Sequence, residues 1–156
     1  MPRETAQKIT LPNGTEIYAP LVKVTIEIGN RGLAHWGMVD SGADDILVPA
    51  ALVAALGVDF DQLPAGALSQ GAGKDPFETR PCDGVVRYGK YELCRKFKVP
   101  QPGGPNIVLL GRAEVFTKFI IKFHWYKNPP VFDMDPAAPS AGPAAPRSPR
   151  TSSRGR

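Results

Sequence analysis

Cysteine and histidine are scarce in this chain of 156 residues, which has two of each. Two cysteines are too few to form the disulfide framework of a small secreted domain. Neither Cys82 nor Cys94 has another cysteine or a histidine nearby in the sequence, as a zinc site would need. His35 and His124 stand far apart and outside any ligand or triad pattern. These shortages exclude a disulfide-rich extracellular domain. They predict structural thiols, a reducing cytoplasmic location, and no bound metal or cofactor.

Long apolar runs are missing as well. No stretch approaches the ~18 consecutive apolar residues that a membrane-spanning helix needs. Residues 1–14 lack the apolar segment of a secretory signal peptide. We therefore expect no partnership with a membrane.

Positive charge is concentrated at the C-terminal end. Four arginines (Arg147, Arg150, Arg154 and Arg156) account for the net charge of +4, because residues 1–136 hold 15 basic and 15 acidic side chains. After Asp135 the chain is almost entirely Pro, Ala, Ser, Gly, Thr and Arg, a composition that does not form a core. The sequence predicts one domain over residues 1–132 and a disordered tail over residues 133–156. The neutral domain favours no nucleic-acid partner.

The hydrophobic pattern is that of short strands. Residues 21–28 alternate apolar and polar side chains and end at Gly29-Asn30, which is typical of a half-buried strand entering a turn. Pro49 and Gly57 bracket a short helix, and residues 114–118 fit a helical turn. Further strands are expected within residues 7–14, 33–39, 79–88, 91–99, 107–110 and 119–125. About eight strands without βαβ alternation predict an all-β, closed or sandwich-like fold.

The clearest chemical motif is Val39-Asp40-Ser41-Gly42-Ala43-Asp44-Asp45. It places a carboxylate directly after a strand, among small residues that let a substrate backbone come close. Taken alone, the motif also fits an ordinary turn, in which Asp, Ser and Gly are common. Its meaning therefore depends on the rest of the sequence.

A second motif, Ile107-Val-Leu-Leu-Gly111-Arg112, follows some 70 residues later. With the alternating strand before Asp40 and the glycines Gly71 and Gly73 between the two motifs, the order over residues 18–126 resembles the retropepsins, the retroviral-type aspartic proteases. The resemblance implies a single-lobe acid-protease β fold that is active as a two-fold homodimer. It also implies an endopeptidase that cleaves extended, largely apolar segments of peptide or protein substrates.

The resemblance assigns roles to individual residues. Asp40 is the implied catalytic carboxylate, Ser41 braces the two catalytic loops across the dimer, and Gly42 and Asp44 lie along the substrate main chain. The other implied substrate-binding residues are Ala43, Asp45, Leu47, Gly71, Ala72, Gly73, Ile107 and Leu109.

Structural support is implied for Gly111 and Arg112, with Arg112 forming an ion pair with Asp44. The alternative for Arg112 is an exposed side chain at a strand end, where pairing contributes under ~1 kcal/mol. Ala113 departs from the pattern, because many members carry Asp or Asn there.

The sequence contains a single Asp-Ser-Gly loop, so one chain supplies one catalytic carboxylate. A two-fold axis through the site would supply the second. Two carboxylates about 3 Å apart repel by about 5 kcal/mol at an effective dielectric near 20, so the pair keeps one proton over a wide pH range. The ionised member can then deprotonate a water while the protonated member donates to the scissile carbonyl.

The glycine-rich segment around Gly71 and Gly73 has two interpretations. A phosphate loop is excluded by spacing, because six residues separate Gly66 from Gly73 and Lys74 is followed by Asp75. A hairpin tip that closes over substrate fits the composition better.

Three functions are compatible with these patterns. The first is an active homodimeric endopeptidase, and the second is an inactive protease-like dimer that binds peptides or serves assembly. The third is a nucleic-acid or membrane role of the basic tail, which four arginines without aromatic neighbours support weakly. The intact Asp40-Ser41-Gly42 loop favours the first, since a protein that only binds has no chemical need for an acid there.

Overall fold

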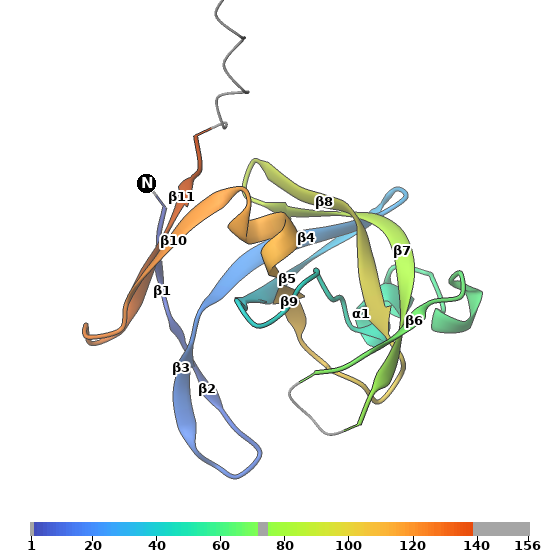
Figure 1. The fold of residues 1–156 in the computed structure, drawn as a ribbon, viewed down its shortest axis with the longest axis horizontal. Coiled ribbons are helices and arrows are strands. Elements are labelled where there is room, and N and C mark those ends of the chain that lie inside the picture. The colour runs from blue at the N-terminus through green and yellow to red at the C-terminus, as the bar shows by residue number, and fades with distance from the viewer. Residues whose placement is uncertain (1, 72–74, 139–156) are drawn as a thin grey trace, which may run out of the picture.

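A computed structural model describes residues 2–71 and 75–138 of the chain. Within these residues it is mostly β, as the sequence predicts, with eleven strands rather than about eight (Figure 1). Five strands precede the one α-helix of the described residues: β1 (Arg3–Thr5), β2 (Gln7–Thr10), β3 (Glu16–Ala19), β4 (Leu21–Ile28), β5 (Arg31–Val39) and then α1 (Ala50–Ala55). Six follow it: β6 (Ala67–Ser69), β7 (Phe77–Tyr88), β8 (Tyr91–Pro100), β9 (Val108–Leu110), β10 (Phe119–His124) and β11 (Val131–Pro136).

The largest sheet is built on two hairpins. Its order is β6-β7-β4-β5-β9, and β8 pairs with β7. Gly29 and Gly89 turn the β4–β5 and β7–β8 hairpins with φ of 59° and 54°, values that a glycine adopts without strain. Strand β9 pairs in parallel with the end of β5, far from it in sequence. This pairing brings the two sequence motifs together.

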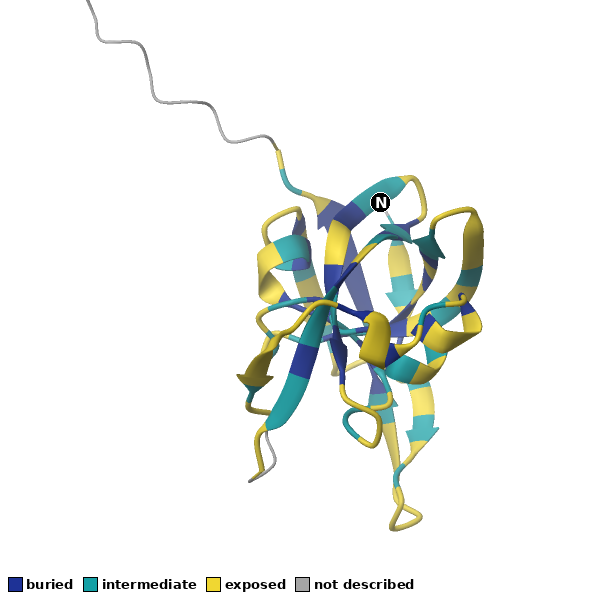
Figure 2. Ribbon diagram, turned by 90° about the vertical axis from the view of Figure 1, so that its right-hand side faces the viewer, coloured by how far each residue is buried: buried dark blue, intermediate teal, exposed yellow. Residues whose placement is uncertain are grey.

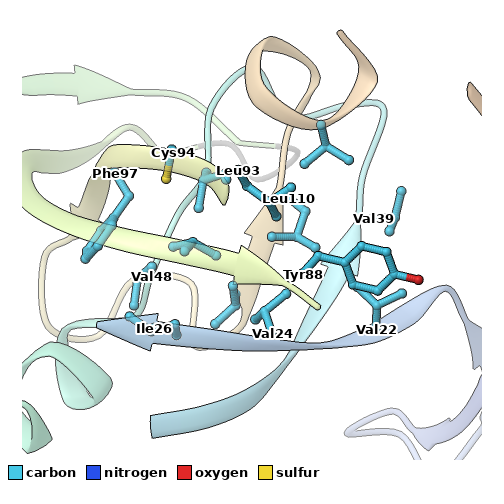
Figure 3. Close-up of a cluster of buried hydrophobic side chains, with 14 of the residues drawn as sticks. Val22, Val24, Ile26, Val39, Val48, Tyr88, Leu93, Cys94, Phe97 and Leu110 are labelled. Carbon is cyan, nitrogen blue, oxygen red and sulfur yellow. The ribbon is translucent and has the colours of Figure 1, made fainter. Parts of the chain in front are cut away.

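The core lies between this sheet and the segments that fold over it (Figure 3). Val22, Val24 and Ile26 of β4 point inward and are fully or almost fully buried, whereas the side chains between them alternate to the outside, as the period-2 pattern predicts. Leu93, Phe97 and Leu110 come from other strands to pack in the same cluster. Figure 2 shows the buried residues gathered in the body of the molecule.

Helix α1 confirms the predicted Pro and Gly boundaries. Pro49 precedes its first residue, and Gly57, with φ of 89°, follows its end. A helical turn at Phe60–Gln62 comes next, and a second one at Arg112–Phe116 overlaps the turn expected at residues 114–118.

Both cysteines are buried and free, as structural thiols should be. Burial raises the pKa of Cys94 to about 11 and also raises that of Cys82. Neither thiol is therefore a ready nucleophile near neutral pH. No helix of the described residues is long and apolar enough to span a membrane.

The chain ends form a second sheet with the order β1-β11-β10. Phe132 and Met134 of β11 are completely buried. The expected boundary at residue 132 is therefore corrected, because the strand that fills this part of the core continues to Pro136. Of the tail predicted to be disordered over residues 133–156, residues 133–136 belong to β11, and residues 139–156 lie outside the described residues.

An ionic cluster holds the terminal sheet together on its other face. Arg3 donates to both carboxylate oxygens of Asp133, at 2.7 and 3.1 Å, and His124 contacts the same carboxylate at 2.7 Å. The hydrogen bonds from Arg3 and then from His124 hold the pKa of Asp133 far below its usual value. The ionised carboxylate therefore ties three strands together.

The acid dependence of stability should report this cluster. Because the folded pKa of Asp133 lies below its unfolded value of about 4, the ionised group stabilises the fold above that pH, and this contribution is lost as pH falls further. We expect Asp133→Asn to lower the free energy of unfolding at pH 7, with the difference from the parent protein shrinking between pH 5 and pH 2. Urea unfolding measures it, with the exposed Asp61→Asn as control. A difference independent of pH would contradict this role of Asp133.

Candidate active site

Asp40 stands where β5 ends and the chain leaves the sheet. Its backbone N–H donates to the carbonyl of Leu110 at 3.1 Å, which continues the parallel pairing of β5 with β9 by one residue. The pairing of Val39 with Leu110 buries two apolar side chains directly beneath the loop. The core therefore fixes the position at which the carboxylate emerges.

The Asp40 loop is a tight turn closed on its own carboxylate. The N–H of Gly42 donates to Oδ1 of Asp40 at 2.8 Å, and the N–H of Ala43 donates to the Asp40 carbonyl at 3.3 Å. A Cβ at Gly42 would lie 3.1 Å from the same oxygen, which is tighter than usual, so glycine favours this contact. The two interpretations of the motif, an ordinary turn and a catalytic loop, are thus compatible, because the turn orients the carboxylate.

The end of β9 packs closely against the second half of the loop. Arg112 N–H donates to the Ala43 carbonyl and Ala113 N–H to the Asp44 carbonyl, both at 2.9 Å. Between these segments Gly111 is buried, and a Cβ there would lie 2.7 Å from the backbone nitrogen of Asp45. Because the opposing atoms are backbone, they have no side-chain rotamer to relieve the overlap.

We expect Gly111→Ala to destabilise the protein by about 1–3 kcal/mol, the usual cost of overpacking a tight site. Gly32→Ala is the matched control, because it adds the same methyl group to β5, where the nearest atom would lie 3.4 Å away, an ordinary contact. Chemical denaturation of both variants tests this expectation. Equal stabilities would show that the loop moves to accept the side chain.

Two ion pairs flank the loop. Arg112 pairs with Asp44, which confirms the implied pair, although both side chains are largely exposed in the single chain. Asp45 pairs with Lys98 of β8 at 2.5 Å. Nearby, burial and then the negative charge of Asp45 raise the pKa of Glu114. Asp44 and Asp45 are thus each paired with a basic side chain, whereas Glu114 is partly removed from water beside Asp45.

A cleft of about 560 Å³ opens beside the Asp40 loop. One wall is the loop itself, and the opposite wall is the end of β6 with the start of β7. Its lining residues are Asp40, Gly42, Ala43, Asp44, Asp45, Leu47, Leu68, Ser69, Gln70, Gly71, Phe77, Lys98, Pro105 and Leu109. The cleft therefore places the carboxylates of the Asp40 loop beside several apolar side chains.

The structure brings most of the implied site residues to this cleft. Ser41 is exposed next to it, and Ile107 is half-buried just before β9; neither belongs to its lining. Ala72 and Gly73 lie outside the described residues. The lining residues that the sequence did not reveal are Leu68, Ser69, Gln70, Phe77, Lys98 and Pro105. The structure alone singles out Leu68, a large apolar side chain that is 74% exposed.

A larger hollow of about 800 Å³ lies elsewhere, between α1, the turn at residues 59–62 and the loop at residues 101–106. Its ionisable lining residues are Asp59 and Asp61, both exposed. Size alone does not make it the better candidate, because it lacks the oriented carboxylate and the tightly fixed loop of the first cleft.

Comparison with solved structures identifies the fold. A structure described as a retropepsin-like aspartic protease from Rickettsia conorii has a TM-score of 0.55 to this chain, is 21% identical, and is matched over 85% of this chain and 98% of its own. The chain has the retropepsin-like fold. The EIAV protease complexed with the inhibitor HBY-793 gives 18% identity and a TM-score of 0.43, over 70% of this chain and 93% of its own. No protein-family model and no curated protein matches the chain.

The retropepsin-like fold agrees with the resemblance that the two motifs suggested. The Asp40 loop follows β5, and Gly111-Arg112 follows β9, so both motifs leave neighbouring strands of the largest sheet (Figure 1). The fold class predicted from the sequence is thereby confirmed for the single chain.

Proposed function

We propose that the protein is an aspartic endopeptidase that acts as a homodimer, with Asp40 of each copy forming the catalytic pair. The observation that carries this proposal is the placement of the Asp40 carboxylate. Gly42 orients it, β9 supports the loop from below, and a partly apolar cleft lies beside it. Such an arrangement suits a group that must hold its position while a substrate binds.

The chemistry requires two such carboxylates and one water. In the dimer, the close pair would share one proton, because ionising both carboxylates would place two negative charges side by side. The ionised Asp40 takes a proton from the water, which attacks the scissile carbonyl carbon. The protonated Asp40 donates to the carbonyl oxygen, giving a gem-diol intermediate. The Asp40 that took the water proton then passes it to the amide nitrogen as the C–N bond breaks, and the other Asp40 takes a proton back from one diol hydroxyl, leaving a carboxylic acid and a free amine. The atoms balance as addition of one water across the peptide bond.

The cleft favours extended peptides with apolar side chains. Leu47 and Leu109 lie on the side of the Asp40 loop, and Leu68 and Phe77 on the opposite wall. Burying an apolar side chain of the substrate against them contributes about 25 cal/mol for each Å² removed from water. Arg112 would act as support for Asp44 rather than in the reaction. A cytoplasmic location stays a prediction.

Asp40→Asn should abolish peptide cleavage while leaving the fold intact, because asparagine has the same shape but cannot share the proton. Cleavage of a denatured protein mixture between pH 4 and pH 7, with the cut sites mapped by mass spectrometry, measures the activity. Asp59→Asn, a change at an exposed acid of the larger hollow, is the control and should keep the parent rate.

The outcome separates the proposal from its alternatives. Cleavage by Asp40→Asn at the parent rate would refute the assignment. Peptide binding without any cleavage by the parent protein would instead favour the inactive, peptide-binding dimer.

Truncation tests the role of the terminal sheet. A chain ending at Ala138 keeps all of β11 and the hydrogen bond from Ala137 N–H to the Lys118 carbonyl, so its activity should remain near that of the full chain. A chain ending at Lys118 loses β10 and β11, including the buried Phe132 and Met134, and should lose both dimer and activity. Activity assays with sedimentation analysis measure both properties. An active chain ending at Lys118 would show that this sheet is dispensable.

A further inference from the structure

The hairpin of β2 and β3 projects away from the body of the molecule, as both views show (Figures 1 and 2). Its two strands pair with each other and with no other strand of the described residues. At its base, Ala6 and Ala19 are buried, and Ala6 N–H donates to the Pro130 carbonyl at 2.9 Å. The hairpin is therefore anchored at one end and free of other strands beyond it.

The projecting part has two chemically different faces. On one face Ile9 lies opposite Ile17, and Ile17 is 40% exposed. On the other face Lys8 forms an ion pair with Glu16 at 2.8 Å, beside the exposed Thr10. An isolated two-stranded hairpin is marginally stable in water, so a packing partner for its isoleucine side would stabilise it.

The position of the hairpin indicates which partner this is. In Figure 1 the hairpin and β10 lie on the same side of the molecule as the end of β5, from which the Asp40 loop emerges. Strand β10 and the turn after it carry further exposed apolar side chains, Ile120, Phe123, Trp125 and Tyr126. A second copy that brings its own Asp40 to the first must approach this side, since a two-fold interface uses the same surface on both copies.

We propose that the isoleucine side of the β2–β3 hairpin packs against a second copy of this chain and is part of the dimer interface. The proposal rests on the homodimer of the proposed function, and adds to it a segment largely outside residues 18–126, where the sequence resemblance lies. The hairpin is too small to supply the roughly 800 Å² that each partner usually buries in a stable interface. It therefore acts together with the apolar side chains of β10.

Two lysine substitutions on opposite faces of the hairpin provide the test. Ile17→Lys puts a charge on the isoleucine side, and Thr10→Lys puts the same charge on the other side, across from Glu16. We expect Ile17→Lys to raise the dimer dissociation constant by about tenfold or more, the effect of removing an interface anchor. Thr10→Lys should leave it within about twofold of the parent protein. Analytical ultracentrifugation over a dilution series measures the constant, and circular dichroism checks that both variants remain folded.

The possible results discriminate clearly. A dimer unaffected by Ile17→Lys, an equal loss in both variants, or a parent protein that is monomeric throughout would overturn the proposal. Asp40→Asn serves as the independent readout of the reaction. If Ile17→Lys stays dimeric while cleavage still depends on Asp40, the hairpin proposal fails and the proposed function stands. If Ile17→Lys becomes monomeric and the parent protein cleaves nothing, the hairpin proposal stands and the proposed function fails.

Discussion

The candidate site depends on the close approach of two backbones, the loop after β5 and the end of β9. Parallel pairing of these strands continues into hydrogen bonds from Asp40, Arg112 and Ala113, so the loop is attached to the core at several points. Gly111 makes this approach possible, because a side chain there would overlap the backbone of the loop. A surface loop is ordinarily the most mobile part of a fold, and these contacts restrain this one.

This constraint determines how charge is distributed at the cleft. Asp44 and Asp45 each have a basic partner, Arg112 and Lys98, whereas the Asp40 carboxylate accepts a backbone hydrogen bond from Gly42. Asp44 and Asp45 thus each have a cation beside them, and the Asp40 carboxylate faces the cleft for contact with a bound molecule.

The terminal sheet shows how much of the fold lies outside the two motifs. Strand β11 uses one face to fill the core with Phe132 and Met134, and the other to hold Arg3 and His124 through Asp133. Alternation of apolar and acidic residues is the ordinary pattern of a half-buried strand. The acids in it are nevertheless almost fully buried, because the neighbouring strands place basic side chains over them.

The sequence by itself predicted much of the local structure and the candidate catalytic motif. Period-2 alternation located β4, Pro49 and Gly57 bounded α1, and the order of the Asp40 and Gly111-Arg112 motifs indicated the retropepsin-like fold. Only the tertiary structure decided that β11 belongs to the domain, that Ile107 lies outside the cleft, and that Lys98 and Phe77 line it. These facts depend on which distant strands become neighbours. The spacing of apolar residues describes each strand separately and does not say which strands pair. A residue such as Lys98 looks like any outward-facing strand position until the fold places Asp45 beside it.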